Sequence, residues 1–387
     1  MSSIFCAQEP SLGYLYQIRY GLKLLLREQN DDAVLLIETI DDISISRPQN
    51  VDVYQTKFHI NNPPNISNAS TDFWKTIRVW CESITSGQIN ADKCVFSLIT
   101  TAATSPGSIL SKLSHSAVNA RKVDEVVSEM IAVTNTSTNQ ANLPAYQAFV
   151  ALSPENKVKL VKNITILDSA EGINEAKTDI ITNLRFVNKN YEPLFERVEG
   201  WFLGQVILQL QGQRPGIQVR ELQQVIWDIA DTLKSDNLPA DFMASIAGDE
   251  AQLSPYRDRQ FVKQLHIIGA NHGVINHAIS DYHRAFSQAS KWMREGLISP
   301  QDQMDYQHKL RDDWSRKHSA ACNIVEGEED EKAAARGHSF YHNFYVLQNP
   351  FIYIKDRFKE TYMVTGSCQM LSDSKKIGWH PKFETLL

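Results

Sequence analysis

The stretch that decides the fold of the N-terminal half runs from Ala33 to Lys57 and reads AVLLIETIDDISISRPQNVDVYQTK. Ala33 to Ile37 is a short apolar run between turn residues, which is typical of a buried strand. Ile43 to Ser46 and Val51 to Phe58 alternate between apolar and polar residues, which predicts two more strands around the turn Arg47-Pro48-Gln49-Asn50. We therefore expect a three-stranded meander with acidic residues at its first turn.

Helical patterns flank this meander. Residues 11–28 carry apolar side chains at helical spacing, and a second helix is expected from Ser70 or Thr71 onward, before a buried strand at residues 94–100. An order of helix, three strands, helix and strand predicts a mixed sheet with helices on its faces. Beyond it we expect helices at about 106–133, 142–152, 171–183, 191–210 and 219–233, a polar loop at 133–142 and a short strand at 164–166.

The segment Asp236-Asn237-Leu238-Pro239-Ala240 is a candidate boundary between two domains. We expect one domain at residues 1–240 and a mainly helical domain at residues 250–387. In the second domain Ile275, Ile279, Tyr282, Phe286, Ala289 and Met293 fall on one helical stripe, which predicts a core-facing helix.

Composition excludes several classes of protein. No apolar run reaches the roughly 18 residues that a membrane span needs, and the N-terminus lacks the pattern of a secretory signal, so we expect a cytoplasmic protein. The five cysteines, Cys6, Cys81, Cys94, Cys322 and Cys368, are scattered and contain no Cys-x-x-Cys pair, which favours reduced thiols over a zinc ribbon or a disulfide framework.

The formal net charge of −6 is unevenly distributed. Residues 245–387 contain 18 Lys and Arg and 18 Asp and Glu, which leaves 21 basic and 27 acidic residues in the first 244. Proteins that bind DNA by themselves usually present a basic face, because phosphate contacts supply much of the affinity. If the N-terminal half acts on DNA, we expect it to do so poorly alone.

The polar ends of the predicted strands carry a candidate catalytic group. Gln55 and Lys57 share one face of the third strand, because side chains two residues apart point the same way. Glu38 ends the first strand and Asp41 and Asp42 occupy the turn after it, where these acids can lie beside Gln55 and Lys57.

Mg²⁺, which prefers oxygen ligands, would supply a nucleophilic water for phosphodiester hydrolysis and neutralise the phosphate. Mn²⁺ would be a substitute. Asp42 would bind the ion with help from Glu38 or Asp41, and Gln55 would add its amide oxygen or orient a water. Lys57 would hold the water and stabilise the developing charge.

Other interpretations of these residues stay open. A Gln-x-Lys sequence on a strand and acids at a hairpin turn also occur as purely structural features.

His338 and His342 lie four residues apart on a predicted helix, but no third ligand of matching type accompanies them, which disfavours a zinc site. No phosphate-binding loop of the Gly-x-x-x-x-Gly-Lys-Ser/Thr type is present, so any ATPase must be a partner.

Four motifs stand out in residues 10–100: Gly13-Tyr14-Leu15-Tyr16-Gln17, Glu38-x-x-Asp41-Asp42, Val53-Tyr54-Gln55-Thr56-Lys57 and Phe73-Trp74-Lys75-Thr76. Together they resemble the double-stranded-DNA endonuclease domain of anti-phage effectors such as those of CBASS systems, within the PD-(D/E)xK restriction-endonuclease-like superfamily. The resemblance implies that Asp42, Gln55 and Lys57 are catalytic and that Glu38 and Gln17 lie near the site. Gln55 replaces the commoner Glu, which leaves open which acids complete the metal shell.

The C-terminal region has motifs of its own, among them Ser254-Pro255-Tyr256-Arg257-Asp258-Arg259, Asp281-Tyr282-His283-Arg284-Ala285-Phe286, Arg336-Gly337-His338 and Gly378-Trp379-His380-Pro381. They resemble the C-terminal domain of effectors from ABC-three-component systems. A nuclease joined to such a domain is similar to the effector subunit of Lamassu-type systems. The resemblance implies an SMC-like ATPase and a small accessory subunit as partners, and double-stranded DNA as substrate.

Taken together, these patterns predict a metal-dependent DNA endonuclease of a bacterial defence complex. We expect the ATPase complex to hold it inactive until release and homo-oligomerisation assemble a DNA-binding surface. A non-catalytic adaptor with a degenerate nuclease fold is the alternative from another class, and a nuclease directed at RNA is a third.

Overall fold

A computed structural model describes residues 8–59, 65–347 and 351–386. It divides the chain into two compact units, Met1–Ile229 and Ala230–Leu387, so the division falls a few residues before the predicted boundary segment. Cys6 lies outside the described residues, and the other four cysteines are buried and free. No helix in the described part of the chain has the length and hydrophobicity that a membrane span requires.

The first unit contains a mixed sheet of six strands in the order β5-β4-β3-β2-β1-β6. Its strands are β1 (Val34–Ile37), β2 (Ile43–Ser46), β3 (Val51–Lys57), β4 (Cys94–Thr100), β5 (Ile164–Leu167) and β6 (Ile217–Gln218). β6, β1, β2 and β3 pair antiparallel, whereas β3, β4 and β5 pair parallel. The prediction of a mixed sheet flanked by helices is therefore confirmed.

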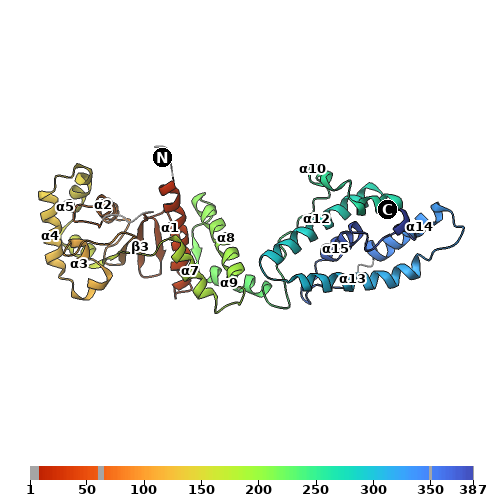
Figure 1. The fold of residues 1–387 in the computed structure, drawn as a ribbon. Helices are drawn as coiled ribbons and strands as arrows, with labels where there is room; N and C mark the ends of the chain where they lie inside the picture. The colour runs from red at the N-terminus through yellow and green to blue at the C-terminus, as the bar shows by residue number, and fades with distance from the viewer. Residues whose placement is uncertain (1–7, 60–64, 348–350, 387) are drawn as a thin grey trace. The chain divides into compact units, whose positions relative to one another are not determined.

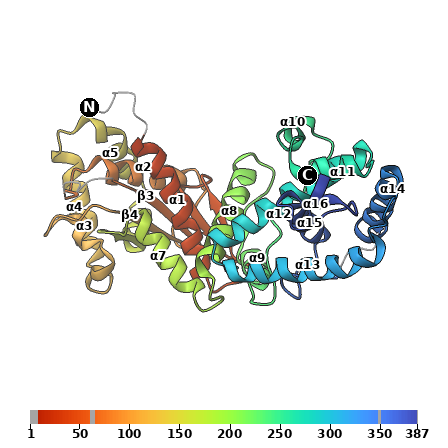
Figure 2. The same ribbon diagram turned by 45° about the vertical axis from the view of Figure 1, so that its right-hand side comes forward.

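Helices cover both faces of this sheet (Figure 1). They are α1 (Gln8–Arg27), α2 (Thr71–Thr85), α3 (Ile109–Lys112), η1 (His115–Ala120), α4 (Val123–Thr136), η2 (Gln140–Asn142), α5 (Leu143–Ala151), α6 (Pro154–Asn163), α7 (Ile173–Leu184), α8 (Tyr191–Leu210) and α9 (Val219–Thr232). α1 packs on β1, β2 and β3 and against α7 and α8, while α2 packs on α5 and α6 contacts β4. Figure 2 gives a second view of these layers.

Two expectations for this unit are wrong. The single helix predicted at about 106–133 is three shorter segments, the first of which begins after Gly107, with a φ of 73°, and is capped by the Ser108 side chain, which accepts the N–H of Ser111. The predicted polar loop after Val133 is partly helical, since α4 continues to Thr136. Neither feature changes the sheet that carries the candidate site.

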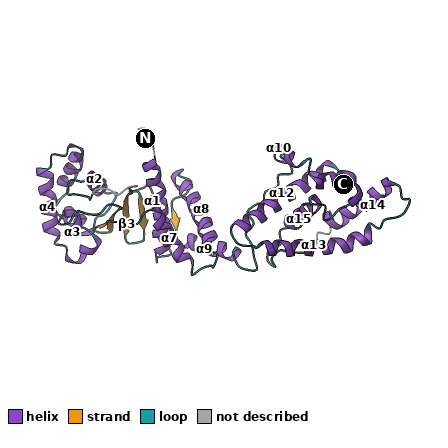
Figure 3. Ribbon diagram, viewed as in Figure 1, coloured by secondary structure: helices purple, strands orange, loops and turns teal. Residues whose placement is uncertain are grey.

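The second unit is helical in its described part, as Figure 3 shows, and thus confirms the expected helical C-terminal region. Its elements are α10 (Glu250–Leu253), η3 (Ser254–Tyr256), α11 (Gln260–Ile267), α12 (His272–Arg294), α13 (Pro300–Ala321), α14 (Asp330–Phe340), the π-helix η4 (Tyr341–Leu347), α15 (Thr361–Asp373) and α16 (Phe383–Leu386). α12 and α15 form its centre, and Gly366 lets them approach, because an added Cβ would lie 2.0 Å from the Asp281 carbonyl oxygen. The predicted stripe on α12 is only partly a core face, since Phe286 and Met293 are exposed.

Candidate functional site

The turn between β1 and β2 carries the three acids that the sequence singles out. The main-chain N–H of Glu38 donates to the carbonyl oxygen of Asp42 (3.0 Å), which closes the turn. Glu38 has a φ of 52°, in the left-handed region that residues other than glycine rarely adopt. Such a backbone costs on the order of 1–3 kcal/mol and persists only where surrounding contacts enforce it. The turn therefore depends on the contacts that its neighbours make.

Gln17 of α1 supplies one of those contacts. Its buried side chain donates from Nε2 to the Glu38 Oε1 atom (2.9 Å) and to the Asp42 carbonyl oxygen (2.6 Å). One amide thus connects the helix to both ends of the acidic turn. Sequence reasoning left open whether Gln17 reaches the site or only lies on a polar helix face, and the structure places it in direct contact with the acidic turn.

The Asp42 carboxylate extends the sheet. The last residue pair between β2 and β3 is Ile43 with Tyr54, and beyond it Asp42 Oδ2 accepts both the main-chain N–H and the hydroxyl of Thr56 (2.7 Å each). A side chain therefore takes the place of the next main-chain acceptor. Among the described residues no donor contacts Asp42 Oδ1, which leaves one carboxylate oxygen for another ligand.

Asp41 points in a different direction, toward α2. Its Oδ2 atom accepts the indole N–H of the buried Trp80 (2.7 Å), and its Oδ1 atom accepts the main-chain N–H of Asp42 (3.1 Å). Burial and, to a smaller extent, the negative charge of Asp42 raise the pKa of Asp41 to about 7, although its hydrogen bonds with Trp80 and the Asp42 N–H and the positive charge of Lys57 lower it. Lys57 therefore lies close enough to Asp41 for their charges to interact.

Gln55 and Lys57 follow Val53 on one face of β3, by the alternation of strand side chains. Val53 packs in the same hydrophobic cluster as Trp80 of α2, so this face is the one that α2 covers. Gln55 is buried and Lys57 is half-buried at the end of the strand. The Lys57 ammonium forms no ion pair with any residue of the described ranges. It is a cation available to a ligand.

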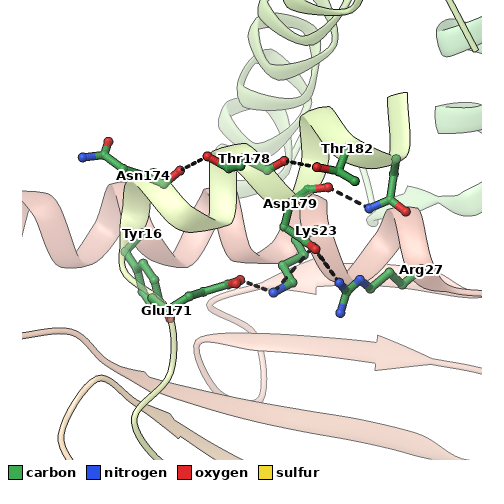
Figure 4. Close-up of polar contacts among 9 residues, drawn as sticks. Tyr16, Lys23, Arg27, Glu171, Asn174, Thr178, Asp179 and Thr182 are labelled. Atoms are coloured by element: carbon green, nitrogen blue, oxygen red, sulfur yellow. Dashed lines mark hydrogen bonds and ion pairs between the residues drawn. The ribbon is translucent and has the colours of Figure 1, made fainter. Parts of the chain in front are cut away.

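Helix α7 holds α1 in place, as Figure 4 shows. The Tyr16 hydroxyl donates to the Glu171 carbonyl oxygen (3.0 Å), and the Lys23 ammonium pairs with the Glu171 carboxylate and with Asp179 (3.6 Å). Asp179 also pairs with Arg27 (2.7 Å). Lys23 is buried, so these carboxylates compensate a charge that the protein interior would otherwise disfavour. This ion-pair network fixes the helix that carries Gln17.

The donors of the turn have the chemistry that a hard cation requires. Asp42 Oδ1 and Glu38 Oε2 accept no hydrogen bond from a described residue, and Gln55 offers a third oxygen on the adjacent strand. Within the described ranges no three His, Cys, Asp or Glu side chains converge on one point, so an ion here would keep several waters. His338 and His342 stack with ring centroids 6.4 Å apart, and the described residues supply no third ligand to them.

Three residues of this region were missed by sequence reasoning. Thr56 contacts Asp42, and Trp80 contacts Asp41. Neither contact can be predicted from a local sequence pattern. His59 could have been found from the sequence. It lies two residues after Lys57 and four after Gln55, so the strand alternation that groups Gln55 with Lys57 also includes His59.

Comparisons with known proteins agree with part of the sequence-based expectation. Residues 261–387 match the model of C-terminal domain 7 of the ABC-three component (ABC-3C) systems, which confirms the predicted resemblance of the C-terminal region. No curated protein matches the chain. Among solved structures, a Moraxella osloensis Cap4 SAVED/CARF-domain containing receptor is similar with a TM-score of 0.36 and 12% identity, over 73% of this chain and 69% of that chain.

The ion-pair network predicts a large effect of removing its cation. We expect Lys23→Met to lower the free energy of unfolding by about 1.5–3 kcal/mol, because the Glu171 carboxylate loses its charged partner while Asp179 keeps Arg27. Lys122→Met is the matched control, since Lys122 pairs with Glu125 on an exposed surface, where such pairs contribute about 0–1 kcal/mol. Urea unfolding measures both, and equal effects would show that the network does not stabilise α1.

The raised pKa of Asp41 predicts a pH dependence of stability. The folded protein favours the protonated Asp41 carboxyl. The contribution of this carboxyl to the free energy of unfolding is therefore fully present below about pH 4 and is lost as the pH rises through about 7. Relative to wild type, Asp41→Asn should gain on the order of 4 kcal/mol in free energy of unfolding between pH 4 and pH 8 in EDTA, since the pKa of Asp41 lies about 3 units above its ordinary value and one unit corresponds to about 1.4 kcal/mol. Parallel stability profiles of the two proteins would contradict this assignment.

Proposed function

We propose that the protein is a metal-dependent DNA endonuclease and the effector of an ABC-three-component defence system, with a restriction-endonuclease-like N-terminal domain. The observation that carries the proposal is the Lys57 ammonium beside the acidic turn, which pairs with no acid of the described ranges and lies at the end of a strand that also presents Gln55. A cation next to carboxylates, with polar groups converging from α1 and β3, is an arrangement suited to a phosphodiester. The match of residues 261–387 supports a defence effector.

Each side chain has a defined task in this proposal. Lys57 contacts a non-bridging phosphate oxygen and stabilises the charge that develops when water attacks phosphorus. Gln55 orients that water through its amide. Asp42 and Glu38 bear the negative charges that bind a cation, and Gln17 and Thr56 keep their carboxylates in position. Asp41, held by Trp80, adjusts the local charge through its carboxyl group.

Mg²⁺, or Mn²⁺ in its place, would be held by Asp42, Glu38 and Gln55, and it would supply Lewis-acid stabilisation of the phosphate and a more acidic water. This donor set contains only oxygen atoms, which suits both ions.

The C-terminal unit is proposed to dock on the partner subunits, an SMC-like ATPase and a small accessory protein in the bacterial cytoplasm. The acidic excess of residues 1–244 supports regulation by assembly, because such a domain attracts phosphates weakly by itself. Release from the ATPase complex and homo-oligomerisation would bring several active sites onto duplex DNA of a phage or plasmid. In this proposal the protein belongs to the Lamassu type.

A non-catalytic adaptor with a degenerate nuclease fold is the second candidate. It is favoured by one observation, that the described acids do not form a cluster of three around one point. The two candidates differ in whether the chemistry of Lys57 matters.

Lys57→Ala decides between them. We expect this variant to cleave plasmid DNA about 10²- to 10³-fold more slowly than wild type in Mg²⁺, because it removes a charge that stabilises the transition state. Lys93→Ala removes the same charge beside the first residue of β4, at the opposite end of the sheet, and should cleave like wild type. Anti-phage protection that survives Lys57→Ala in folded protein would favour the adaptor.

Assembly control makes a separate prediction. The cleavage rate per chain should rise at least tenfold as the isolated protein is concentrated from monomer to oligomer, because several copies create the surface that holds DNA. Sedimentation and cleavage measured on the same samples test this dependence. Rapid cleavage by a stable monomer would show that the nuclease is not controlled by assembly.

A further inference from the structure

The extended chain of β3 continues past the end of the strand to His59. Beyond the last pair with β4, the Thr101 N–H donates to the Lys57 carbonyl oxygen (3.3 Å), and the His59 N–H donates to Thr101 Oγ1 (3.0 Å). A threonine hydroxyl thus replaces a main-chain carbonyl as the acceptor. The register of the strand is therefore maintained for two residues after Lys57.

This extension sets the direction of the His59 side chain. Phe58 stacks on Tyr16 of α1 with ring centroids 5.0 Å apart, so it points to the face of the sheet that α1 covers. Alternation then places His59 on the other face, in line with Lys57 and Gln55. The contact of His59 with Asp72 in the first turn of α2 agrees with this direction. Gln55, Lys57 and His59 form one row.

Two carboxylates flank the imidazole ring, one near each nitrogen. Asp72 Oδ2 lies 3.4 Å from Nε2, and Glu9 Oε1 of α1 lies 3.8 Å from Nδ1. Lys57 is the cation of the same row, and Thr101 presents an uncharged hydroxyl. The His59 side chain is 30% exposed, so it is oriented and still accessible. Glu9 is the more distant partner and is 58% exposed, which makes Nδ1 the nitrogen that a substrate can approach.

Phosphodiester hydrolysis needs a proton for the sugar oxygen that leaves. Lys57 and the acidic turn account for charge neutralisation and water activation, but not for this step. Asp41 does not suit it, because its carboxyl is engaged by Trp80 and by the main chain of Asp42. In the row of described residues formed by Gln55, Lys57 and His59, the imidazole is the group whose chemistry suits this step, because histidine is the most frequent general acid and base in proteins.

We propose that His59 is the general acid of the cleavage reaction, with Asp72 and Glu9 as its positioning residues. The inference rests on the proposed nuclease function. Water oxygen bonds to phosphorus, the bond between phosphorus and the leaving sugar oxygen breaks, and the Nδ1 proton of the His59 imidazolium moves to that oxygen. The attacking water gives its proton to solvent, and His59 regains one from solvent.

A substrate with sulfur at the leaving position tests this role, because a thiolate leaves without protonation. The ends of the wild-type products identify which sugar oxygen leaves, and a duplex oligonucleotide with sulfur at that bridging position is then compared with the ordinary duplex. We expect His59→Gln to cleave the oxygen substrate about 10²-fold more slowly than wild type. On the sulfur substrate the two proteins should agree within about threefold, because the proton donor is no longer needed.

The controls separate this role from a structural one. His115→Gln, in the exposed part of η1, should cleave both substrates like wild type. Asp72→Asn should lose less activity than His59→Gln and should also recover on sulfur. Equal losses of His59→Gln on both substrates, or no loss on either, would overturn the general-acid assignment while leaving the nuclease intact. A wild type that cleaves neither substrate, alone or with its partner subunits, would instead overturn the proposed function and the inference with it.

Discussion

A single buried amide, that of Gln17, ties the first helix to the turn that carries the acids. Its Nε2 atom donates to the Glu38 carboxylate and to the carbonyl oxygen of Asp42, and so it contacts both ends of that turn. Glu38 adopts a left-handed backbone conformation that is unfavourable without such enforcement. If Gln17 moved, the turn would lose the side-chain contact that holds its first acid. The position of α1 is therefore the constraint on which the acidic turn depends.

That constraint is set by residues far along the chain. Glu171 and Asp179 compensate the buried Lys23, and the main chain of Glu171 accepts the Tyr16 hydroxyl. A buried ammonium with one partner missing is costly, so α1 has one favourable position against α7. Helix α7 follows β5, the edge strand of the sheet, and α1 precedes β1. The position of the acidic turn therefore depends on a helix that is more than 130 residues away in the sequence.

The sequence predicts correctly those helices and strands that have a clear local pattern. The bounds of β2, β4 and α8 agree with the prediction, because alternation, an apolar run and a long helical repeat each leave a clear periodic signal. The two-residue strand β6 left no such signal. The direction of Asp41 and Asp42 could not be predicted either, since a strand period does not extend through a turn. Asp41 faces Trp80 and Asp42 faces Thr56, on elements that only tertiary packing brings near.

The two candidate ligand acids belong to different parts of the fold. Asp42 is fixed by Thr56, so its remaining oxygen moves with β3, the strand that presents Gln55 and Lys57. Glu38 is fixed by Gln17, so its carboxylate moves with α1. A small displacement of α1 against the sheet would release the Glu38 side chain, while the hydrogen bond between the Glu38 N–H and the Asp42 carbonyl oxygen keeps the turn closed. Docking of α1 therefore orients the Glu38 carboxylate, whereas the Asp42 carboxylate is oriented by β3 itself.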